Sequence, residues 1–207
     1  MATPAAVGQL TLEKYPLWRS GKVREIFDLG DRFLFVATDR VSAFDVILPT
    51  LIPGKGVLLT GISRFWFDRT SGLLPNHLDT CDLDDLELSD TERKILAGRS
   101  MIVRKAERID IECVVRSHLA GTGWEEYRRH GTLAGEPLPE GLQAGDPLPE
   151  PKFSPALKND AGHDENISID VLRTRIGQAL ANRLEETSLA IFREAQKIAN
   201  RAGFVIA

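Results

Sequence analysis

The strongest constraint on this 207-residue chain is a pair of β-rich segments separated by a tight turn. The segments cover 22–27 and 33–37, and Gly30 and Asp31 lie between them. Glycine and aspartate are typical of tight turns between paired strands, so the pattern predicts a β-hairpin over 21–38. Because the second arm is apolar throughout, we expect other elements to cover it on both faces.

Further elements are predicted in the first half of the chain. Apolar residues at helical spacing predict a helix over 60–71, and the segment 54–56 is interpreted as a turn because it follows a proline. The spelling Ser-Asp-Thr-Glu at 89–92 is a capping box, which predicts the start of a short helix. An apolar run at 101–103 predicts a strand.

The second half predicts one alternating strand and two helical regions. Apolar and polar residues alternate over 109–116, which predicts a strand with one buried face. A second capping-box spelling at 122–125 predicts a helix that Gly131 ends. An amphipathic pattern predicts helix over 168–202. The apolar residues 204–207 then indicate the first residues of a buried strand, which would place the end of the chain inside an element.

A proline-rich segment interrupts this pattern at 132–157. It holds six of the eleven prolines, and Gly-Glu-Pro-Leu-Pro-Glu at 135–140 recurs almost unchanged at 145–150. Since each proline fixes φ and removes a backbone donor, we expect a loop or arm without sheet or helix. It is either a plain linker or a loop that serves a site or an interface.

Charge and cysteine usage narrow the class of protein. A net charge of -4 provides no general attraction to nucleic acid or to an anionic membrane, so a phosphate ligand would need locally placed Lys and Arg. Cys81 and Cys113 match neither a disulfide framework nor a metal spacing, which favours a reducing cytoplasm. The first ten residues lack signal-peptide features, and no apolar run approaches the roughly 20 residues of a spanning helix. The oligomeric state stays open.

Four polar segments are candidate sites, and each has a structural alternative. Lys22 and Arg24 follow Gly21 and could contact phosphate, or they could protect a strand edge. The segment 38–45 follows a buried strand, as binding residues often do, or it is a turn. The segment 116–123 joins an arginine and two glycines to a helix start, which suits an anion, although Arg116 could instead pair with Glu112 or another acid to fasten the strand.

The fourth segment, 157–166, is the densest polar cluster. It combines a lysine, a histidine and three carboxylates, which would suit a substrate amine or Mg²⁺ and match no zinc spacing. A solvated capping loop is the alternative.

In combination these segments resemble one enzyme family, the phosphoribosylaminoimidazole-succinocarboxamide (SAICAR) synthases, over about 15–207. The resemblance rests on SGKVREIFDLGDRFLFVATDRVSAFD, IECVVRSHLAGTGWEEY and FSPALKNDAGHDENIS, and the long proline-rich arm is similar to the larger, yeast-like branch. It implies an ATP- and Mg²⁺-dependent ligase of purine biosynthesis that joins an imidazole carboxylate ribonucleotide to L-aspartate.

The resemblance also implies residue roles. ATP is expected to contact Gly21, Lys22, Arg24, Arg104, Lys105 and Glu107. The nucleotide and aspartate are expected to contact Ser42, Asp45, Arg116, Ser117, Gly121, Thr122, Lys158, Asp160, His163 and Asp164. No catalytic base and no metal ligand is assigned. The family usually has Gly-Ser where this chain has Gly121 and Thr122, and it continues with an acidic ATP- and Mg²⁺-binding segment that does not follow Ala207.

We therefore expect an α+β fold. An antiparallel-sheet lobe similar to the small lobe of protein kinases would cover 1–105, and an α/β domain, expected to be incomplete, would cover 106–207. Two alternatives are a nucleotide-binding fragment or regulator without ligase activity, and a kinase. A kinase is disfavoured because neither H-R-D nor D-F-G occurs.

Overall fold

The computed structural model describes residues 5–44, 46–158 and 165–207. Its contacts divide the chain into two compact units, Met1–Glu107 and Arg108–Ala207. Both units mix helices with antiparallel strands, and the α+β class expected from the sequence is confirmed. Among the described residues, no helix is both long and apolar enough to cross a membrane.

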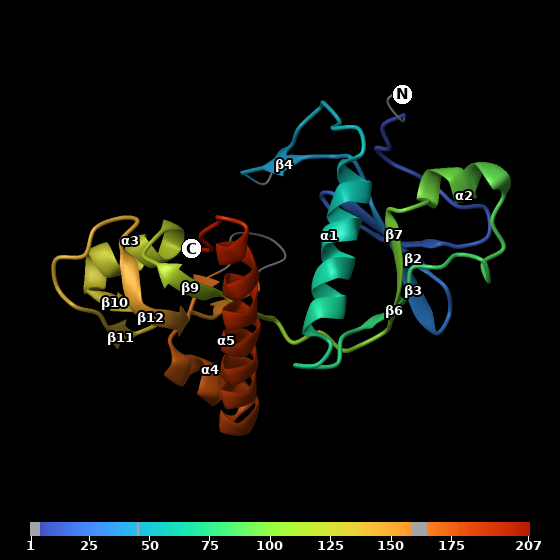
Figure 1. The fold of residues 1–207 in the computed structure, drawn as a ribbon. Helices are drawn as coiled ribbons and strands as arrows, with labels where there is room; N and C mark the ends of the chain where they lie inside the picture. The colour runs from blue at the N-terminus through green and yellow to red at the C-terminus, as the bar shows by residue number, and fades with distance from the viewer. Residues whose placement is uncertain (1–4, 45, 159–164) are drawn as a thin grey trace. The chain divides into compact units, whose positions relative to one another are not determined.

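The first unit is built on a five-stranded antiparallel sheet (Figure 1). In spatial order its strands are β1 (Leu17–Ser20), β2 (Arg24–Asp28), β3 (Arg32–Ala37), β7 (Ser100–Arg104) and β6 (Leu78–Thr80). The remaining elements are helices α1 (Lys55–Thr70) and α2 (Asp90–Leu96) and a small hairpin of β4 (Ser42–Ala43) and β5 (Val46–Ile47).

The central hairpin of β2 and β3 confirms the sequence prediction. Phe27 pairs with Leu34 across it, and Gly30 turns the chain with φ 93°, a conformation that glycine adopts without strain. The expected burial of β3 on both faces is only partly correct. Leu34 and Val36 are fully buried, whereas Phe33 and Phe35 on the other face are half-buried.

The core of this unit lies on the Leu34 face of the sheet. Its buried members come from three strands and from the segment around α2, and they are Phe27, Leu34, Val36, Leu86, Leu96 and Ile102. The capping box at the start of α2 is confirmed, because Ser89 Oγ accepts from Glu92 N while Glu92 Oε2 accepts from Ser89 N at 2.7 Å.

Helix α1 begins earlier than predicted, and the interpretation of 54–56 as a turn is correct only for Gly54. Gly54 is the N-cap with φ 81°, and Lys55 and Gly56 are the first helical residues. A Cβ on Gly56 would lie 2.2 Å from Ala37 O, so only glycine lets the helix start this close to β3. The close contact between the start of α1 and the end of β3 cannot be predicted from the residues around Gly56.

The second unit contains short strands and three helices. The strands are β8 (Ile111–Glu112), β9 (Val115–His118), β10 (Thr132–Leu133), β11 (Glu136–Pro137), β12 (Pro147–Phe153), β13 (Ala156–Leu157) and β14 (Glu165–Asn166). The helices are α3 (Gly121–His130), α4 (Ile169–Ile176) and α5 (Gln178–Arg201). β9 pairs with β12, β13 pairs with β8 and β14, and α5 contacts both β9 and β12.

The single strand predicted over 109–116 is wrong. The segment is divided into β8 and β9, which join different sheets because each pairs with a different partner. Ile109 and Cys113, expected on a buried face, are exposed. Ile111 and Val115, from the same predicted face, are partly buried against the core of this unit, so the alternation marks the buried face only in part.

The prediction that 132–157 has no strand is also wrong. β10 and β11 form a hairpin, and β12 has prolines at 147, 149 and 151. Within the described residues β12 pairs only with β9, and its register shifts between Pro147 and Lys152. Pro149 and Pro151 thus lie in an irregular stretch of an edge strand, where prolines are tolerated. Each copy of the repeat places one leucine, Leu138 or Leu148, in the same small core.

The last predicted elements need two corrections. The helix expected over 168–202 is two helices, because Gly177 with φ 82° and ψ 150° separates α4 from α5. The segment 204–207 has no strand pairing, and Phe204 and Val205 are exposed.

Candidate functional site

The basic loop between β1 and β2 folds back on itself. Gly21 N donates to Arg24 O at 2.7 Å, and a Cβ on Gly21 would lie 3.3 Å from that same oxygen. The glycine therefore permits the tight closure of the loop. Lys22 and Arg24, the two predicted phosphate contacts, are both exposed on this loop.

A row of rings covers the half-buried face of the sheet beside this loop. Trp18 lies 4.7 Å from Phe33, Phe33 lies 6.4 Å from Phe35, and His77 lies 5.9 Å from Phe35 and 5.4 Å from Phe67, as measured between ring centroids. No short sequence motif marks these rings as a group. The alternation of Phe33 and Phe35 in β3 can be read from the sequence, but it does not predict which face of the sheet stays partly exposed to solvent.

Cationic groups lie over this aromatic row. The Arg24 guanidinium lies 5.3 Å from the Phe35 ring centroid, and partial burial there lowers the pKa of Arg24. Burial, followed by the charges of Arg24 and Arg104, lowers the pKa of His77, so its ring is neutral at pH 7. This face thus combines apolar rings with positive charge, which suits a planar, anionic ligand.

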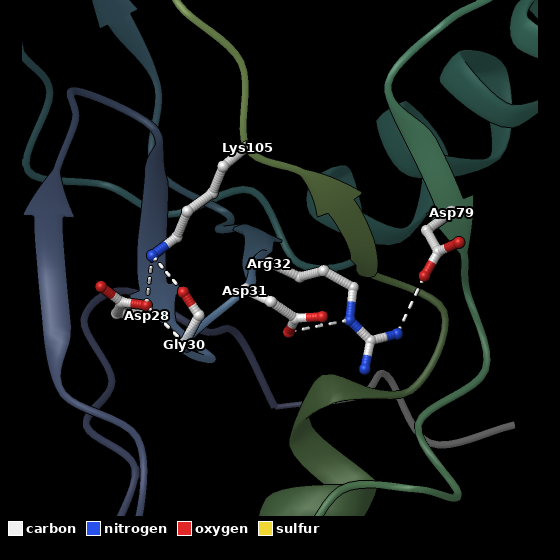
Figure 2. A network of polar contacts seen from close by, with 6 residues as sticks. All are labelled: Asp28, Gly30, Asp31, Arg32, Asp79 and Lys105. Atoms are coloured by element: carbon white, nitrogen blue, oxygen red, sulfur yellow. Dashed lines mark hydrogen bonds and ion pairs between the residues drawn. The ribbon is translucent and has the colours of Figure 1, made fainter.

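The segment after β7 is fastened to the β2–β3 turn (Figure 2). Lys105 Nζ donates to Asp28 Oδ1 at 2.7 Å and to Gly30 O at 2.6 Å, and it lies 4.6 Å from the Phe33 ring centroid. The hydrogen bond from Lys105, together with one from Gly30 N, lowers the pKa of Asp28. Figure 2 also shows Arg32 between Asp31 and Asp79, at the other side of the same turn.

The other predicted residues of the first unit are more dispersed. Arg104 Nη2 donates to Asn76 O at 2.6 Å, and Glu107 is exposed at the end of the unit. Ser42 is half-buried in the β4–β5 hairpin, and Asp45 lies outside the described residues.

Arg116 anchors the candidate site of the second unit. Its Nε donates to Ser154 Oγ at 3.1 Å, its Nη1 to Ala120 O at 3.3 Å and its Nη2 to Thr122 Oγ at 2.8 Å. Burial lowers the pKa of Arg116. Glu112, the acid named as an alternative partner of Arg116, instead accepts from Lys158 Nζ at 2.7 Å.

The start of α3 differs from the predicted capping box at 122–125. Ala120 is the N-cap without a side-chain cap, and Thr122 lies inside the first turn. Gly121 has φ 55°, and a Cβ on Gly123 would lie 3.0 Å from Arg116 Cδ. The two glycines therefore let the arginine lie against the helix N-terminus, where free N–H groups favour an anion.

Ser117 and Lys158 extend this second site. Ser117 is buried, and its Oγ contacts His118 Nδ1 at 2.8 Å and donates to Ile206 O at 2.5 Å. Lys158 is half-buried beside Glu112. Three further predicted residues, Asp160, His163 and Asp164, lie outside the described residues.

A cavity of about 680 Å³ adjoins Thr122. This volume is in the range of small-molecule sites. Its charged lining comes from α3 and β14, and the lining as a whole consists of Thr122, Glu125, Glu126, Arg129, His130, Gly135, Glu165, Asn166, Ile167 and Ser168. Within the described part of the chain, no cluster of His, Cys, Asp and Glu is arranged to hold a metal ion.

Comparison with known proteins places the chain among amide-forming synthases. A family model described as SAICAR synthetase matches residues 17–207. The phosphoribosylaminoimidazole-succinocarboxamide synthase of Thermodesulfovibrio yellowstonii is 46% identical over 200 residues, which cover 96% of this chain and 68% of that protein. The Leptospira interrogans synthase is 47% identical over 186 residues, which cover 90% and 65%.

A solved structure agrees with these relatives. The SAICAR synthase of Saccharomyces cerevisiae, determined in complex with SAICAR, is similar with a TM-score of 0.84 and 34% identity. The match covers 95% of this chain and 67% of that chain. The present chain thus spans about two thirds of the length of the relatives that it matches.

Proposed function

The chain belongs to the SAICAR synthetase family, and from that membership we propose that the protein joins 5-amino-1-(5-phosphoribosyl)imidazole-4-carboxylate to L-aspartate, with conversion of ATP to ADP and phosphate. The match over residues 17–207 carries this proposal. It is supported by the SAICAR, the joined product, bound to the Saccharomyces cerevisiae relative.

The chemistry requires an activated carboxylate. An oxygen of the imidazole carboxylate attacks the γ-phosphorus of ATP, and ADP leaves with the electron pair of the broken P–O bond. The aspartate amine then attacks the acyl carbon, phosphate departs, and the amine loses a proton as the amide forms. The protein's contribution to such a reaction is to position the reactants and to stabilise negative charge.

The first unit is proposed to bind ATP. Gly21 allows the β1–β2 loop to close, and Lys22 and Arg24 carry positive charge on it toward the phosphates. Arg104, Lys105 and Glu107 are proposed to line the adenine, because Lys105 brings the segment after β7 against the aromatic face of the sheet.

The second unit is proposed to bind the imidazole nucleotide and aspartate. Arg116 has further N–H donors beyond its three contacts, and it lies beside the α3 N-terminus, which favours a phosphate or a carboxylate. The other proposed substrate residues are Ser42, Asp45, Ser117, Gly121, Thr122, Lys158, Asp160, His163 and Asp164.

Magnesium is proposed only as the ion that accompanies ATP. The described residues provide no cluster of side chains that could hold a metal ion, so no protein ligand is assigned to it. The expected cytoplasmic location also belongs to this proposal, and it is compatible with Cys81 and Cys113 being free thiols.

The proposal is tested by measuring the release of ADP in the presence of the expected substrates. ADP release should require both the imidazole carboxylate nucleotide and L-aspartate, and L-glutamate should be a much poorer substrate. Equal turnover with unrelated amines would contradict it. A nucleotide-binding regulator would bind ATP without any aspartate-dependent release of ADP, but the relatives, all named synthases, do not favour that alternative.

A further inference from the structure

A buried arginine that plays no part in the proposed chemistry lies beneath the β1–β2 loop. Arg40 is only 5% exposed. Its Nε donates to Lys22 O at 3.0 Å, and its Nη2 donates to Gly21 O at 2.8 Å and to Arg24 O at 3.4 Å. One side chain, three residues after the end of β3, thus contacts three of the four carbonyls of residues 21–24.

Thr38 holds the fourth carbonyl. Val23 O accepts from Thr38 N at 3.0 Å and from Thr38 Oγ at 2.9 Å. All four carbonyl oxygens of the loop therefore accept hydrogen bonds from the strand end beneath it. This orientation keeps the negative ends of four peptide dipoles on Arg40 and Thr38, so they do not face a phosphate that approaches the exposed loop.

The charge of Arg40 is balanced within the lobe. Glu25, 1% exposed, accepts from Arg40 Nη1 at 2.5 Å through Oε1, and its Oε2 is buried without a hydrogen-bond partner among the described residues. A buried ion pair of this kind adds little net stability compared with apolar side chains of similar volume. The main effect of the Arg40–Glu25 pair is to fix the position of the Arg40 guanidinium under the β1–β2 loop.

We propose that Arg40 is a positioning residue that presets the β1–β2 loop, with its carbonyls turned inward and Lys22 and Arg24 presented to a phosphate-bearing ligand. The inference rests on the proposed ATP site of the first unit. It deepens that proposal by assigning the shape of the loop to a residue that never touches the ligand.

Arg99 offers a matched control in the same lobe. It is 4% exposed, and its described hydrogen bonds join Nη1 to Asp39 Oδ1 at 3.0 Å and to Ala37 O at 3.2 Å. Arg99→Lys and Arg40→Lys both alter a buried arginine–carboxylate pair near the end of β3. Only Arg40→Lys removes the planar fork that spans the loop carbonyls.

The test compares the two variants of the 207-residue chain by native trypsin digestion, with fragments identified by mass. Cleavage after Lys22 and Arg24 should be on the order of tenfold faster in Arg40→Lys, since charge-assisted bonds to the loop are lost, and near the wild-type rate in Arg99→Lys. ATP affinity, measured by calorimetry, should fall by a similar factor in Arg40→Lys alone. The affinity for the imidazole nucleotide should not change.

Equal cleavage and equal ATP affinity in the two variants would overturn the positioning role. A wild-type chain that binds no ATP would instead count against the proposed ATP site, while the digestion still reports whether Arg40 holds the loop. If Arg40→Lys does not fold, Thr38→Val removes the hydroxyl that donates to Val23 O and accepts from Arg40 N at 3.4 Å, and it keeps the Arg40 side chain. That variant should accelerate the same cleavages about two- to fivefold, and an unchanged cleavage pattern would refute the proposal.

Discussion

Replacing Arg116 by lysine separates a binding role from a structural one. The arginine contacts Ser154 Oγ, Ala120 O and Thr122 Oγ through three different nitrogens, which places its planar fork beside the α3 N-terminus. A lysine keeps the charge but has one ammonium group, so a bidentate contact to a phosphate or carboxylate becomes a single one. The lost charge-assisted hydrogen bond corresponds to about 1.5–3 kcal/mol, or roughly 10- to 150-fold in affinity.

The assay is calorimetric titration of the imidazole carboxylate nucleotide and of ATP, with thermal unfolding in parallel. Arg116→Lys should weaken binding of the imidazole nucleotide by this factor and leave ATP binding unchanged, and Arg116→Ala should weaken it more. Arg128→Lys is the control, because Arg128 lies on α3 and makes an exposed ion pair with Glu125 at 2.8 Å. Unchanged nucleotide affinity together with a lower melting temperature would show that Arg116 is structural.

Three further predictions concern the first unit. Lys22→Ala and Arg24→Ala should each weaken ATP binding by about 1.5–3 kcal/mol in calorimetry with little change in melting temperature; early melting with normal ATP affinity would instead favour a protective strand edge. Gly56→Ala should lower the free energy of unfolding in urea by about 3 kcal/mol or more, because the new Cβ would overlap Ala37 at the end of β3. Gly61→Ala is the control: a Cβ there has no atom within 4 Å, so the free energy of unfolding should rise by up to about 1 kcal/mol. Equal effects of the two substitutions would contradict the close approach of Gly56 to β3. Burial raises the pKa of Asp39, but hydrogen bonds from the buried Arg99 guanidinium and from two backbone N–H groups outweigh burial, so the pKa is lowered overall. The ionised carboxylate should therefore stabilise the fold above about pH 4, and this stabilisation should be lost as the pH falls through the folded-state pKa. In urea titrations, Asp39→Asn should lower the free energy of unfolding by about 3–5 kcal/mol at pH 7 and should lack this part of the acid dependence.

Local chemistry explains which elements were predictable. The β2–β3 hairpin follows from Gly30 and its β-rich flanks, and the α2 start follows from reciprocal bonds between Ser89 and Glu92. Both depend on residues close together in the chain. The proline-rich strand β12 could not be predicted from neighbouring residues. A strand tolerates proline only at an edge or in an irregular stretch, and whether β12 is such a strand depends on its pairing with β9, which lies about 30 residues earlier in the chain.

The residues of the candidate site also divide into those that belong to short sequence motifs and those that distant segments bring together. The basic residues of the β1–β2 loop and Arg116 beside its glycines were visible as short motifs. The aromatic row that joins Trp18 to His77 was not, because it assembles from separate strands and from the segment before β6. The roles of all these residues remain predictions until binding is measured.

What the sequence by itself determined was the family, the α+β class, and the turns and caps whose partners lie within a few residues. Only the tertiary structure decided that Arg40 lies under the carbonyls of residues 21–24 and that Glu112 pairs with Lys158, leaving Arg116 to the α3 N-terminus. The physical reason is that a hydrogen bond between distant segments depends on where the folded backbone brings its donor and acceptor. That placement follows from the packing of whole elements, which no local pattern specifies.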